Sequence, residues 1–263
     1  MYEDYKALHV ERTGKIVTVK FNRPELRNAT NPQMHQELLR IFPEIGRDPE
    51  AHVVVLTGAG ESFSAGGDLN TLKTSLDDQA RWIDSMIEAK GILDGLLALD
   101  RPVIARINGH AIGLGATLAL FCDITIALET AKIADPHVKV GLVAGDGGAI
   151  IWPALVGYAR AKKYLLTGEA ITGAEAAAIG LVTEAVSADR LDARVAEVAQ
   201  SLADGAAIAI RLTKKAINMS LRAQLDSMIE AHLGYETMSH LSTDHREAVN
   251  AFLERRPPVF TGA

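Results

Sequence analysis

The sequence contains a single cysteine, Cys122, among its 263 residues. One cysteine cannot form an intrachain disulfide, so the fold cannot depend on such a crosslink. Cys122 lies in an apolar run, Leu118 to Ile126, that is typical of a protein core. We therefore expect a buried side chain with no chemical role.

The sequence also lacks an excess of positive charge and any long hydrophobic run. Its formal net charge is -6 and its basic residues are scattered, which disfavours a nucleic-acid partner. A phosphate-bearing ligand stays open, because a few Arg or Lys side chains or a helix N-terminus can bind one. The longest nearly uncharged apolar stretch, Ile112 to Phe121, is about half of the ~20 residues that a membrane-spanning helix needs. Because Met1 to Arg12 is charged and unlike a secretory signal, we expect a cytoplasmic protein with no membrane partner.

The composition is that of an ordinary packed protein, with 48% hydrophobic and 23% charged residues. The segment Leu8 to Phe21 alternates in polarity around Gly14 and predicts a β-hairpin, and His52 to Thr57 predicts a buried strand. Strands and helices alternate through this half, which is typical of an α/β fold. Further helices are expected near residues 32–46, 82–100 and 113–120, and further strands at 103–107, 123–128 and 132–134.

From Gly145 onward the apolar spacing is almost entirely helical. We expect an α/β core over residues 1–200 and a helical C-terminal oligomerisation region over residues 201–263. The sequence shows no internal repeat and no evident linker. Helices are expected near residues 146–156, 159–166, 173–178, 188–203, 206–219, 222–240 and 243–253.

Two glycine-rich segments follow predicted strands, Phe63 to Leu69 and Asn108 to Ala116. Glycines at such places let a ligand atom approach the backbone N–H groups closely, although a tight turn without a ligand has the same composition. The second segment leads into an apolar helix, whose first N–H groups lie at the positive end of the helix dipole. One N–H from each segment, donated to the same oxygen, would form an oxyanion hole.

The two segments, FSAGGDL and INGHAIGLGATLALFCDI, resemble the signature segments of the crotonase (enoyl-CoA hydratase/isomerase) superfamily. Arg23-Pro24, Asn28-Ala29 and the stretch Gly168 to Val186 also resemble that family, so the likeness spans nearly the whole chain. It implies a spiral of strand-strand-helix units, with a tail of helices, that assembles as a homotrimer or a dimer of trimers. It also implies an acyl-CoA substrate, with coenzyme A as part of the substrate and no permanently bound cofactor.

The resemblance also assigns roles to individual residues. The oxyanion donors would be the backbone N–H groups of Gly67 and Leu114. The remaining residues that it places along the substrate and coenzyme A path are Arg27, Asn28, Ala29, Ser64, Ala65, Gly66, Asp68, Leu69, Thr117 and Pro136.

Both glutamates with which hydratases of this family activate water are missing, since Thr117 and His137 stand at their positions. Simple hydration is therefore disfavoured, and isomerase, lyase or hydrolase chemistry is favoured. His137 could move a proton near neutral pH, with Asp146 fixing its tautomer and stabilising the imidazolium. Alternatively, His137 completes a loop and Asp146 caps the following helix.

Two other functions stay open. A branch of the superfamily that cleaves β-diketones without coenzyme A has a similar His and Asp pair, together with a further His where this chain has Leu114. A catalytically silent coenzyme A-binding subunit would also lack both glutamates. The sequence predicts no metal site, because His, Cys, Asp and Glu never occur at ligand spacing. His110 is expected to be structural, and no other functional groups are expected around His9, His35, His52, His232, His240 and His245.

Overall fold

The computed structural model describes residues 2–263 and contains two β-sheets. The larger sheet has six strands in the order β1-β2-β3-β5-β7-β10. β1 and β2 form the expected antiparallel hairpin around Gly14, and the other neighbours are parallel. The strands are β1 Leu8–Thr13, β2 Ile16–Phe21, β3 Val53–Gly58, β5 Val103–Ile107, β7 Ile124–Leu128 and β10 Glu184–Val186.

The smaller sheet has four short strands in the order β4-β6-β8-β9. β4 and β6 are the strands of the two glycine-rich segments, and they pair in parallel. This pairing brings two loops that are far apart in the sequence to the same edge of one sheet. The strands are β4 Ser62–Ser64, β6 His110–Ile112, β8 Lys132–Ala134 and β9 Ile171–Thr172.

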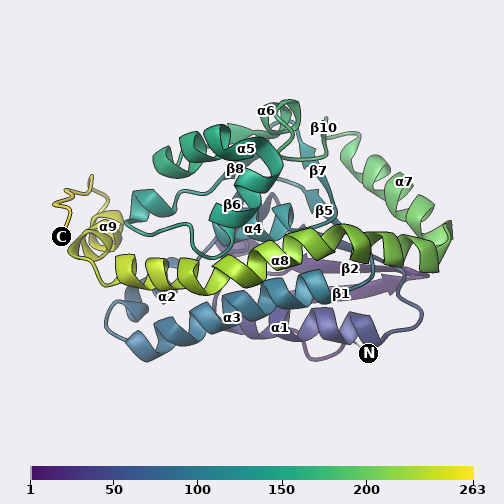
Figure 1. Cartoon of the computed structure of the whole chain (residues 1–263), viewed down its shortest axis with the longest axis horizontal. Coiled ribbons are helices and arrows are strands. Elements are labelled where there is room, and N and C mark those ends of the chain that lie inside the picture. Colours follow the sequence, from purple (N-terminus) through teal and green to yellow (C-terminus); the bar gives the residue numbers. More distant parts are fainter. Residues whose placement is uncertain (1) are drawn as a thin grey trace.

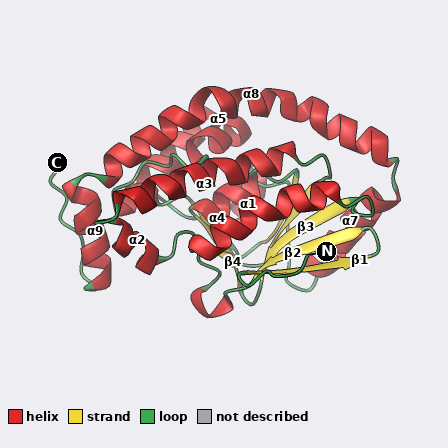
Figure 2. Ribbon diagram, turned by 90° about the horizontal axis from the view of Figure 1, so that it is seen from below, coloured by secondary structure: helices red, strands yellow, loops and turns green. Residues whose placement is uncertain are grey.

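Long helices cover the larger sheet on one side and extend over the smaller one (Figures 1 and 2). α1 (Pro32–Arg47) begins at Asn31, whose side chain accepts a hydrogen bond from the Met34 N–H, and it packs against α3 (Gln79–Ala98). α8 (Ala207–His240) runs along the long axis of the molecule and packs against α3 and against α5 (Gly148–Thr167). The shorter helices are α2 Leu69–Ser75, α4 Leu114–Leu120, α6 Gly173–Ala178 and α9 Thr243–Leu253, with 3-10 turns η1 Pro24–Leu26 and η2 His137–Val140.

The hydrophobic core is divided between the two faces of the larger sheet. The main cluster lies beneath α1, α3 and α8 and includes Cys122, which is buried as predicted. A smaller cluster lies under α7 (Leu191–Asp204), where Val195 and Ala199 pack against Val53 and Ile104. The β-branched run of β3 is buried along its whole length, because side chains of this strand face both clusters.

The α/β fold confirms the prediction, and the predicted first-half elements are present, although β4, β6 and α2 were not predicted. The C-terminal half differs from the expectation. It is not almost entirely helical: β9 and β10 interrupt it, and β10 extends the larger sheet beside β7. These two strands have only two and three residues, and their sequences show too little alternation to stand out among the neighbouring helical segments. The helices expected at 206–219 and 222–240 are the single helix α8. The two helices expected at 146–156 and 159–166 are present within α5, separated by a kink at Gly157, whose φ is 75°. The expected domain boundary after residue 200 falls within α7.

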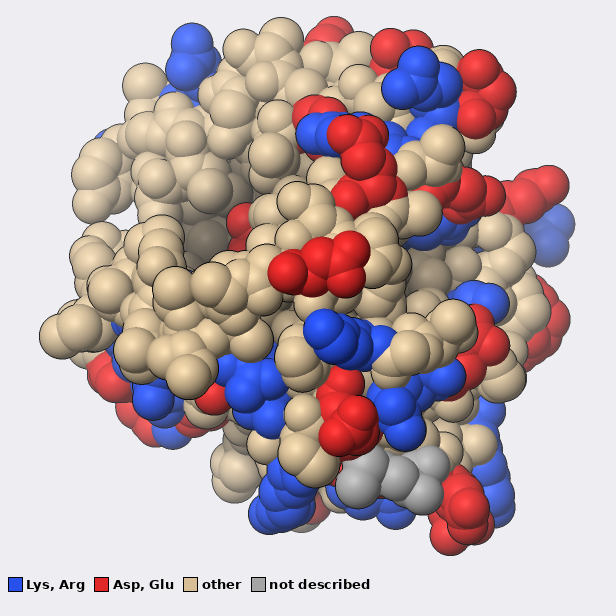
Figure 3. All heavy atoms as spheres, turned by 90° about the vertical axis from the view of Figure 1, so that its right-hand side faces the viewer, with Lys and Arg blue, Asp and Glu red and all other residues tan. Residues whose placement is uncertain are grey.

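The surface beside α7 shows how charge is distributed over one face (Figure 3). Acidic and basic side chains alternate over much of this face, and uncharged residues gather over the rest of it. Within residues 2–263, no helix has both the length and the apolar character needed to cross a membrane.

Candidate active site

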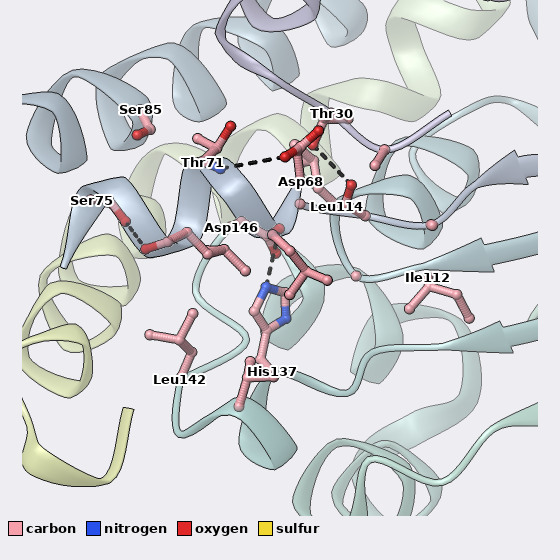
Figure 4. Close-up of a pocket in the computed structure, with 18 of the residues that line it drawn as sticks. Thr30, Asp68, Thr71, Ser75, Ser85, Ile112, Leu114, His137, Leu142 and Asp146 are labelled. Atoms are coloured by element: carbon pink, nitrogen blue, oxygen red, sulfur yellow. Dashed lines mark hydrogen bonds and ion pairs between the residues drawn. The ribbon is translucent and has the colours of Figure 1, made fainter. Parts of the chain in front are cut away.

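A cavity of about 630 Å³ lies where the edge of the smaller sheet meets α2, α3, η2 and the C-terminal helices (Figure 4). One wall is made of backbone and small side chains from the two glycine loops. The opposite wall is apolar, and Trp82, Met86, Leu142, Phe252 and Leu253 contribute to it. His137, Asp146 and Glu236 are among the titratable side chains that line the same space.

The two glycine loops touch one another at Gly66 and Gly113. Both residues have positive φ, 81° and 53°, a backbone conformation that favours glycine. A Cβ added at Gly66 would lie 2.7 Å from the carbonyl oxygen of Ile112, so only glycine allows this approach. The Gly113 N–H donates to the Ala134 carbonyl at 2.9 Å, which fixes the second loop to the end of β8.

The backbone N–H groups of Gly67 and Leu114 belong to these two loops, and both residues line the cavity. Around Gly67, the Thr30 N–H donates to the Gly66 carbonyl at 2.7 Å and the Asp68 N–H donates to the Thr30 carbonyl at 3.0 Å. This bridge does not use the Gly67 N–H. Leu114 is the first residue of α4, so its N–H has no acceptor within the helix.

His137 is held between two aspartates, as Figure 4 shows for one of them. Its Nδ1 forms a short hydrogen bond with the Asp135 carboxylate, and its Nε2 lies 3.7 Å from Oδ2 of Asp146. The Thr117 hydroxyl donates to Oδ1 of Asp146 at 3.3 Å. Thr117 therefore positions the Asp146 carboxylate, which faces His137.

The pKa values of this group are shifted so that the site holds protons tightly. Burial lowers the pKa of His137, but the negative charges of Asp135 and Asp146 outweigh it and hold that pKa well above its usual value. Burial raises the pKa of Asp146, while the His137 imidazolium opposes the rise. The imidazolium form of His137 is therefore favoured at neutral pH, with Asp146 poised to share its proton.

Glu236 reaches the cavity from α8, near the C-terminal end of that helix. Its side chain is buried, and Oε2 has no hydrogen-bond partner within residues 2–263. Burial raises the pKa of Glu236 to about 8; the His137 charge opposes this rise, and the nearby Asp146 and Asp135 carboxylates reinforce it.

Sequence reasoning missed two of these acids. Asp135 is only two positions before His137, and the Asp-Pro-His run is a local signal that could have identified it. Glu236 carries no local signal, because only the path of α8 brings it to His137.

Most residues predicted for the site lie in the cavity wall, and three lie behind it. Asn28 is buried, and its side chain donates to the carbonyls of Ala59 and Ser62, each at 2.8 Å. The Ser64 hydroxyl donates to the Asn28 carbonyl at 2.8 Å, and Thr117 contacts Asp146. These three residues shape the loops from behind. The predicted residues in the wall itself are Arg27, Ala29, Ala65, Gly66, Gly67, Asp68, Leu69, Leu114, Pro136, His137 and Asp146.

Asp68, one of these wall residues, has a structural role that its hydrogen bonds show. Its carboxylate accepts hydrogen bonds from the Asn70 and Thr71 N–H groups at the start of α2, and it forms an ion pair with Arg23 at 2.9 Å. The first glycine loop and α2 are thereby held together.

The prediction that no His, Cys, Asp or Glu residues occur at ligand spacing was wrong. Asp135, His137 and Asp146 each place one ligand-type atom within 4.8 Å of the others. However, Nδ1 of His137 is already engaged by Asp135, and the pair behaves as a proton-holding unit. The donor set therefore fits proton transfer better than metal binding.

Three of the histidines for which no surrounding groups were expected, His35, His240 and His245, do have buried partners. His240 stacks on Trp82 with ring centroids 3.8 Å apart, and His245 lies beside it at 5.0 Å. Nδ1 of His245 donates to the Val140 carbonyl at 2.6 Å, so this cluster ties α9 to the turn that carries His137. His35 pairs with the buried Glu88 at 3.2 Å.

Comparisons with known proteins agree with this architecture. A family model described as enoyl-CoA hydratase/isomerase matches residues 11–263. The 1,2-epoxyphenylacetyl-CoA isomerase of Escherichia coli (strain K12) is 35% identical over 256 residues, which cover 97% of each chain. The short-chain-enoyl-CoA hydratase of Clostridium acetobutylicum is 35% identical over 250 residues, 94% of each chain.

Among solved structures, an enoyl-CoA hydratase/isomerase from Mycobacterium paratuberculosis superimposes with a TM-score of 0.91 at 33% identity. The match covers 95% of this chain and 99% of that one. The fold is therefore the crotonase fold expected from the glycine loops. The chain belongs to the enoyl-CoA hydratase/isomerase family of enzymes, the crotonase superfamily.

Proposed function

We propose that this protein acts on an acyl-CoA thioester through an enolate that the backbone N–H groups of Gly67 and Leu114 stabilise. The observation that carries the proposal is the convergence of these two loops on the cavity that His137 enters. An oxygen bound between the two N–H groups becomes more negative as the enolate forms, so both hydrogen bonds strengthen in the transition state. Each such donor is worth about 3 to 4 kcal/mol.

The proton is moved by the pair of His137 and Asp146. The bond that breaks joins the α-carbon to hydrogen, its electron pair enters the enolate, and the proton is taken up at the pair. A second transfer returns a proton to carbon, and Asp135 keeps the imidazole oriented through Nδ1. Because the site favours the protonated form of His137, it is suited to delivering a proton at neutral pH.

Isomerase, lyase or hydrolase chemistry fits these residues better than simple hydration. Thr117 stands at the position of one hydratase glutamate and His137 at the other, so the usual pair of water-activating carboxylates is replaced. The relatives include both an isomerase and a hydratase, so family membership favours neither reaction over the other.

Coenzyme A enters as part of the substrate in this proposal. Arg27 and Ala29, with the loop from Ala65 to Leu69, form the wall that would face the pantetheine and the nucleotide. These residues present mainly backbone atoms and small side chains, which leaves room for the narrow pantetheine chain to lie close to the wall. We assign no permanently bound cofactor.

We extend the proposal to assembly as a homotrimer or a dimer of trimers, in which residues 201–263 bury apolar surface against other subunits. Exposed apolar side chains on this segment support that role, because surfaces of this kind mark contact sites. Light scattering coupled to gel filtration measures the assembly directly, and a monomer at micromolar concentration would contradict it. The exposed side chains include Ile208, Leu212, Ile217, Met219, Met238 and Leu241.

The experiment that tests the proposed chemistry is a calorimetric titration with acetoacetyl-CoA and, separately, with free coenzyme A. The enolisable thioester should bind tighter than coenzyme A, and the His137→Ala variant should weaken this preference. Binding of neither ligand would favour the β-diketone hydrolase alternative, in which the same His and Asp pair acts without coenzyme A. Tight thioester binding with no exchange of α-protons in any acyl-CoA would favour a silent binding subunit.

A further inference from the structure

Glu236 is an acid that the proposed enolate chemistry does not use. It lies on α8 and lines the cavity together with His137 and Asp146, while only 3% of the residue is exposed. Burying a carboxyl group is costly unless its polar atoms are paired. Its Oε2 has no hydrogen-bond partner within residues 2–263, so part of this cost is unrelieved.

Gly145 packs directly against Glu236 at the edge of the cavity. A Cβ added at Gly145 would lie 2.8 Å from the Glu236 Cβ and 2.9 Å from its Oε2. The missing side chain at Gly145 is therefore what makes room for the carboxyl. The Ser239 hydroxyl, one turn further along α8, accepts a hydrogen bond from the Val143 N–H at 3.0 Å and holds this loop against the helix.

The charges that face Glu236 determine whether it can donate a hydrogen bond. His137 from η2, Asp135 from the segment before it and Asp146 from the segment before α5 all act on this carboxyl. Burial raises the pKa of Glu236 to about 8; the His137 charge opposes that rise and the two aspartates add to it. At neutral pH the carboxyl therefore carries a proton and can serve as a donor.

We propose that Glu236 hydrogen-bonds an oxygen atom on the acyl chain, so that the preferred substrates are acyl thioesters bearing a hydroxyl or keto oxygen beyond the thioester carbonyl. This inference rests on the proposed action on acyl-CoA and specifies its substrate class. A hydrocarbon chain leaves the buried carboxyl without a partner, whereas an oxygenated chain supplies one. Sites built to hydrogen-bond a substrate group discriminate strongly against analogues that lack it.

The apolar wall of the cavity supports this role of Glu236, because its side chains do not offer a hydrogen bond to an oxygen on the acyl chain. Trp82, Met86 and Phe252 can pack only against carbon, and the Trp82 Nε1 already donates to the Thr237 hydroxyl at 3.1 Å. Glu236 reaches the same cavity with an Oε2 that has no hydrogen-bond partner within residues 2–263, which leaves its carboxyl free to bind a chain oxygen. His137 and Asp146 are engaged with one another and with Asp135 and Thr117.

The test compares butanoyl-CoA with 3-hydroxybutanoyl-CoA and 4-hydroxybutanoyl-CoA by calorimetry at pH 6.5 and pH 9.5. We expect at least one hydroxy thioester to bind wild-type protein about tenfold tighter than butanoyl-CoA at the lower pH. The preference should persist at the higher pH, because the ionised Glu236 carboxylate accepts a hydrogen bond from the substrate hydroxyl. Glu236→Gln keeps a donor, so it should retain a preference that does not change with pH; Glu236→Leu should lose the preference.

The outcomes separate this inference from the function on which it rests. Equal binding of all three thioesters by wild-type protein overturns the role of Glu236 while the action on acyl-CoA stands. A preference that survives in Glu236→Leu also overturns it. Butanoyl-CoA binding within about threefold of wild type shows that a variant is folded. If wild-type protein binds no thioester, the proposed function fails, and the inference fails with it.

Discussion

Nε2 of His137 lies 3.7 Å from Oδ2 of Asp146, which places the two proton-carrying groups within one small movement of a hydrogen bond. Replacing either partner removes the route by which a proton reaches the substrate carbon. We expect His137→Ala and Asp146→Asn each to lower the rate of α-proton exchange in butanoyl-CoA by roughly 10²- to 10⁴-fold. Deuterium incorporation from D₂O, followed by mass spectrometry, measures this rate.

The control for this experiment is His110→Gln. His110 lies within the second glycine-rich segment, but it is exposed, and its Nδ1 accepts a hydrogen bond from the Lys132 N–H at 3.2 Å. Its replacement should leave exchange unchanged. Exchange at the wild-type rate in His137→Ala would assign proton transfer to another group.

Asp135 orients His137, and its removal should change the imidazole itself. In Asp135→Asn the negative charge beside Nδ1 is lost, so the pKa of His137 should fall from its raised value toward the usual range. The favoured tautomer should also change, with a loss of roughly 10²- to 10⁴-fold in turnover. NMR titration of the labelled imidazole follows the pKa, and an unchanged titration would contradict an orienting role.

Gly66 and Gly180 form a matched pair for testing the oxyanion hole. Their φ values are 81° and 80°, so alanine is strained equally at both, by about 1 kcal/mol. A Cβ at Gly66 meets the Ile112 carbonyl at 2.7 Å, whereas nothing lies within 4 Å at Gly180. Gly66→Ala must therefore displace the loop that carries the Gly67 N–H.

We expect Gly66→Ala to lose more stability than Gly180→Ala in thermal denaturation, because its Cβ also meets the Ile112 carbonyl, and only Gly66→Ala to lose activity. The loss should be about 10²-fold in α-proton exchange, because a displaced donor no longer meets the enolate oxygen. Equal activity of the two variants would show that the spacing of the loops does not matter for the reaction.

Local sequence signals identified the two glycine loops, because each depends on a few neighbouring residues, whereas His137 was identified through the resemblance to the family. Glycines after a strand predict close backbone approach, and the structure places Gly66 against Ile112 for that reason. The crotonase fold and the family were likewise predictable and are confirmed. Asp146 was named with His137, yet Asp135 was not recognised as the partner of Nδ1, because an aspartate before a proline reads equally well as a turn residue.

Contacts that depend on distant parts of the chain could not be predicted. Glu236 and His137 lie on elements that meet only because α8 crosses the molecule. The periodicity of a sequence predicts a helix, but it does not predict which other elements that helix will contact. The same holds for Trp82 and His240, which belong to α3 and α8. β10 was missed for a related reason, since three half-buried residues become a strand only beside β7.

The stack of His240 on Trp82 makes stability depend on pH. Burial, together with smaller contributions from the charges of His245 and Arg246, lowers the pKa of His240 to about 4. In the unfolded chain the pKa is about 6.5. The folded state therefore resists protonation, so this group's contribution to stability is complete above pH 6.5 and is lost as the pH falls toward 4.

A phenylalanine at position 240 keeps an aromatic ring on Trp82 but cannot be protonated. We expect the melting temperature of His240→Phe, relative to wild type, to rise progressively as the pH is lowered from 7 to 4.5, which corresponds to on the order of 2 kcal/mol. Differential scanning fluorimetry across this range measures the difference. His9→Gln, at an exposed histidine on β1, should show no such trend. A constant difference between His240→Phe and wild type would mean that the buried imidazole becomes protonated without unfolding, and that the stack tolerates the charge.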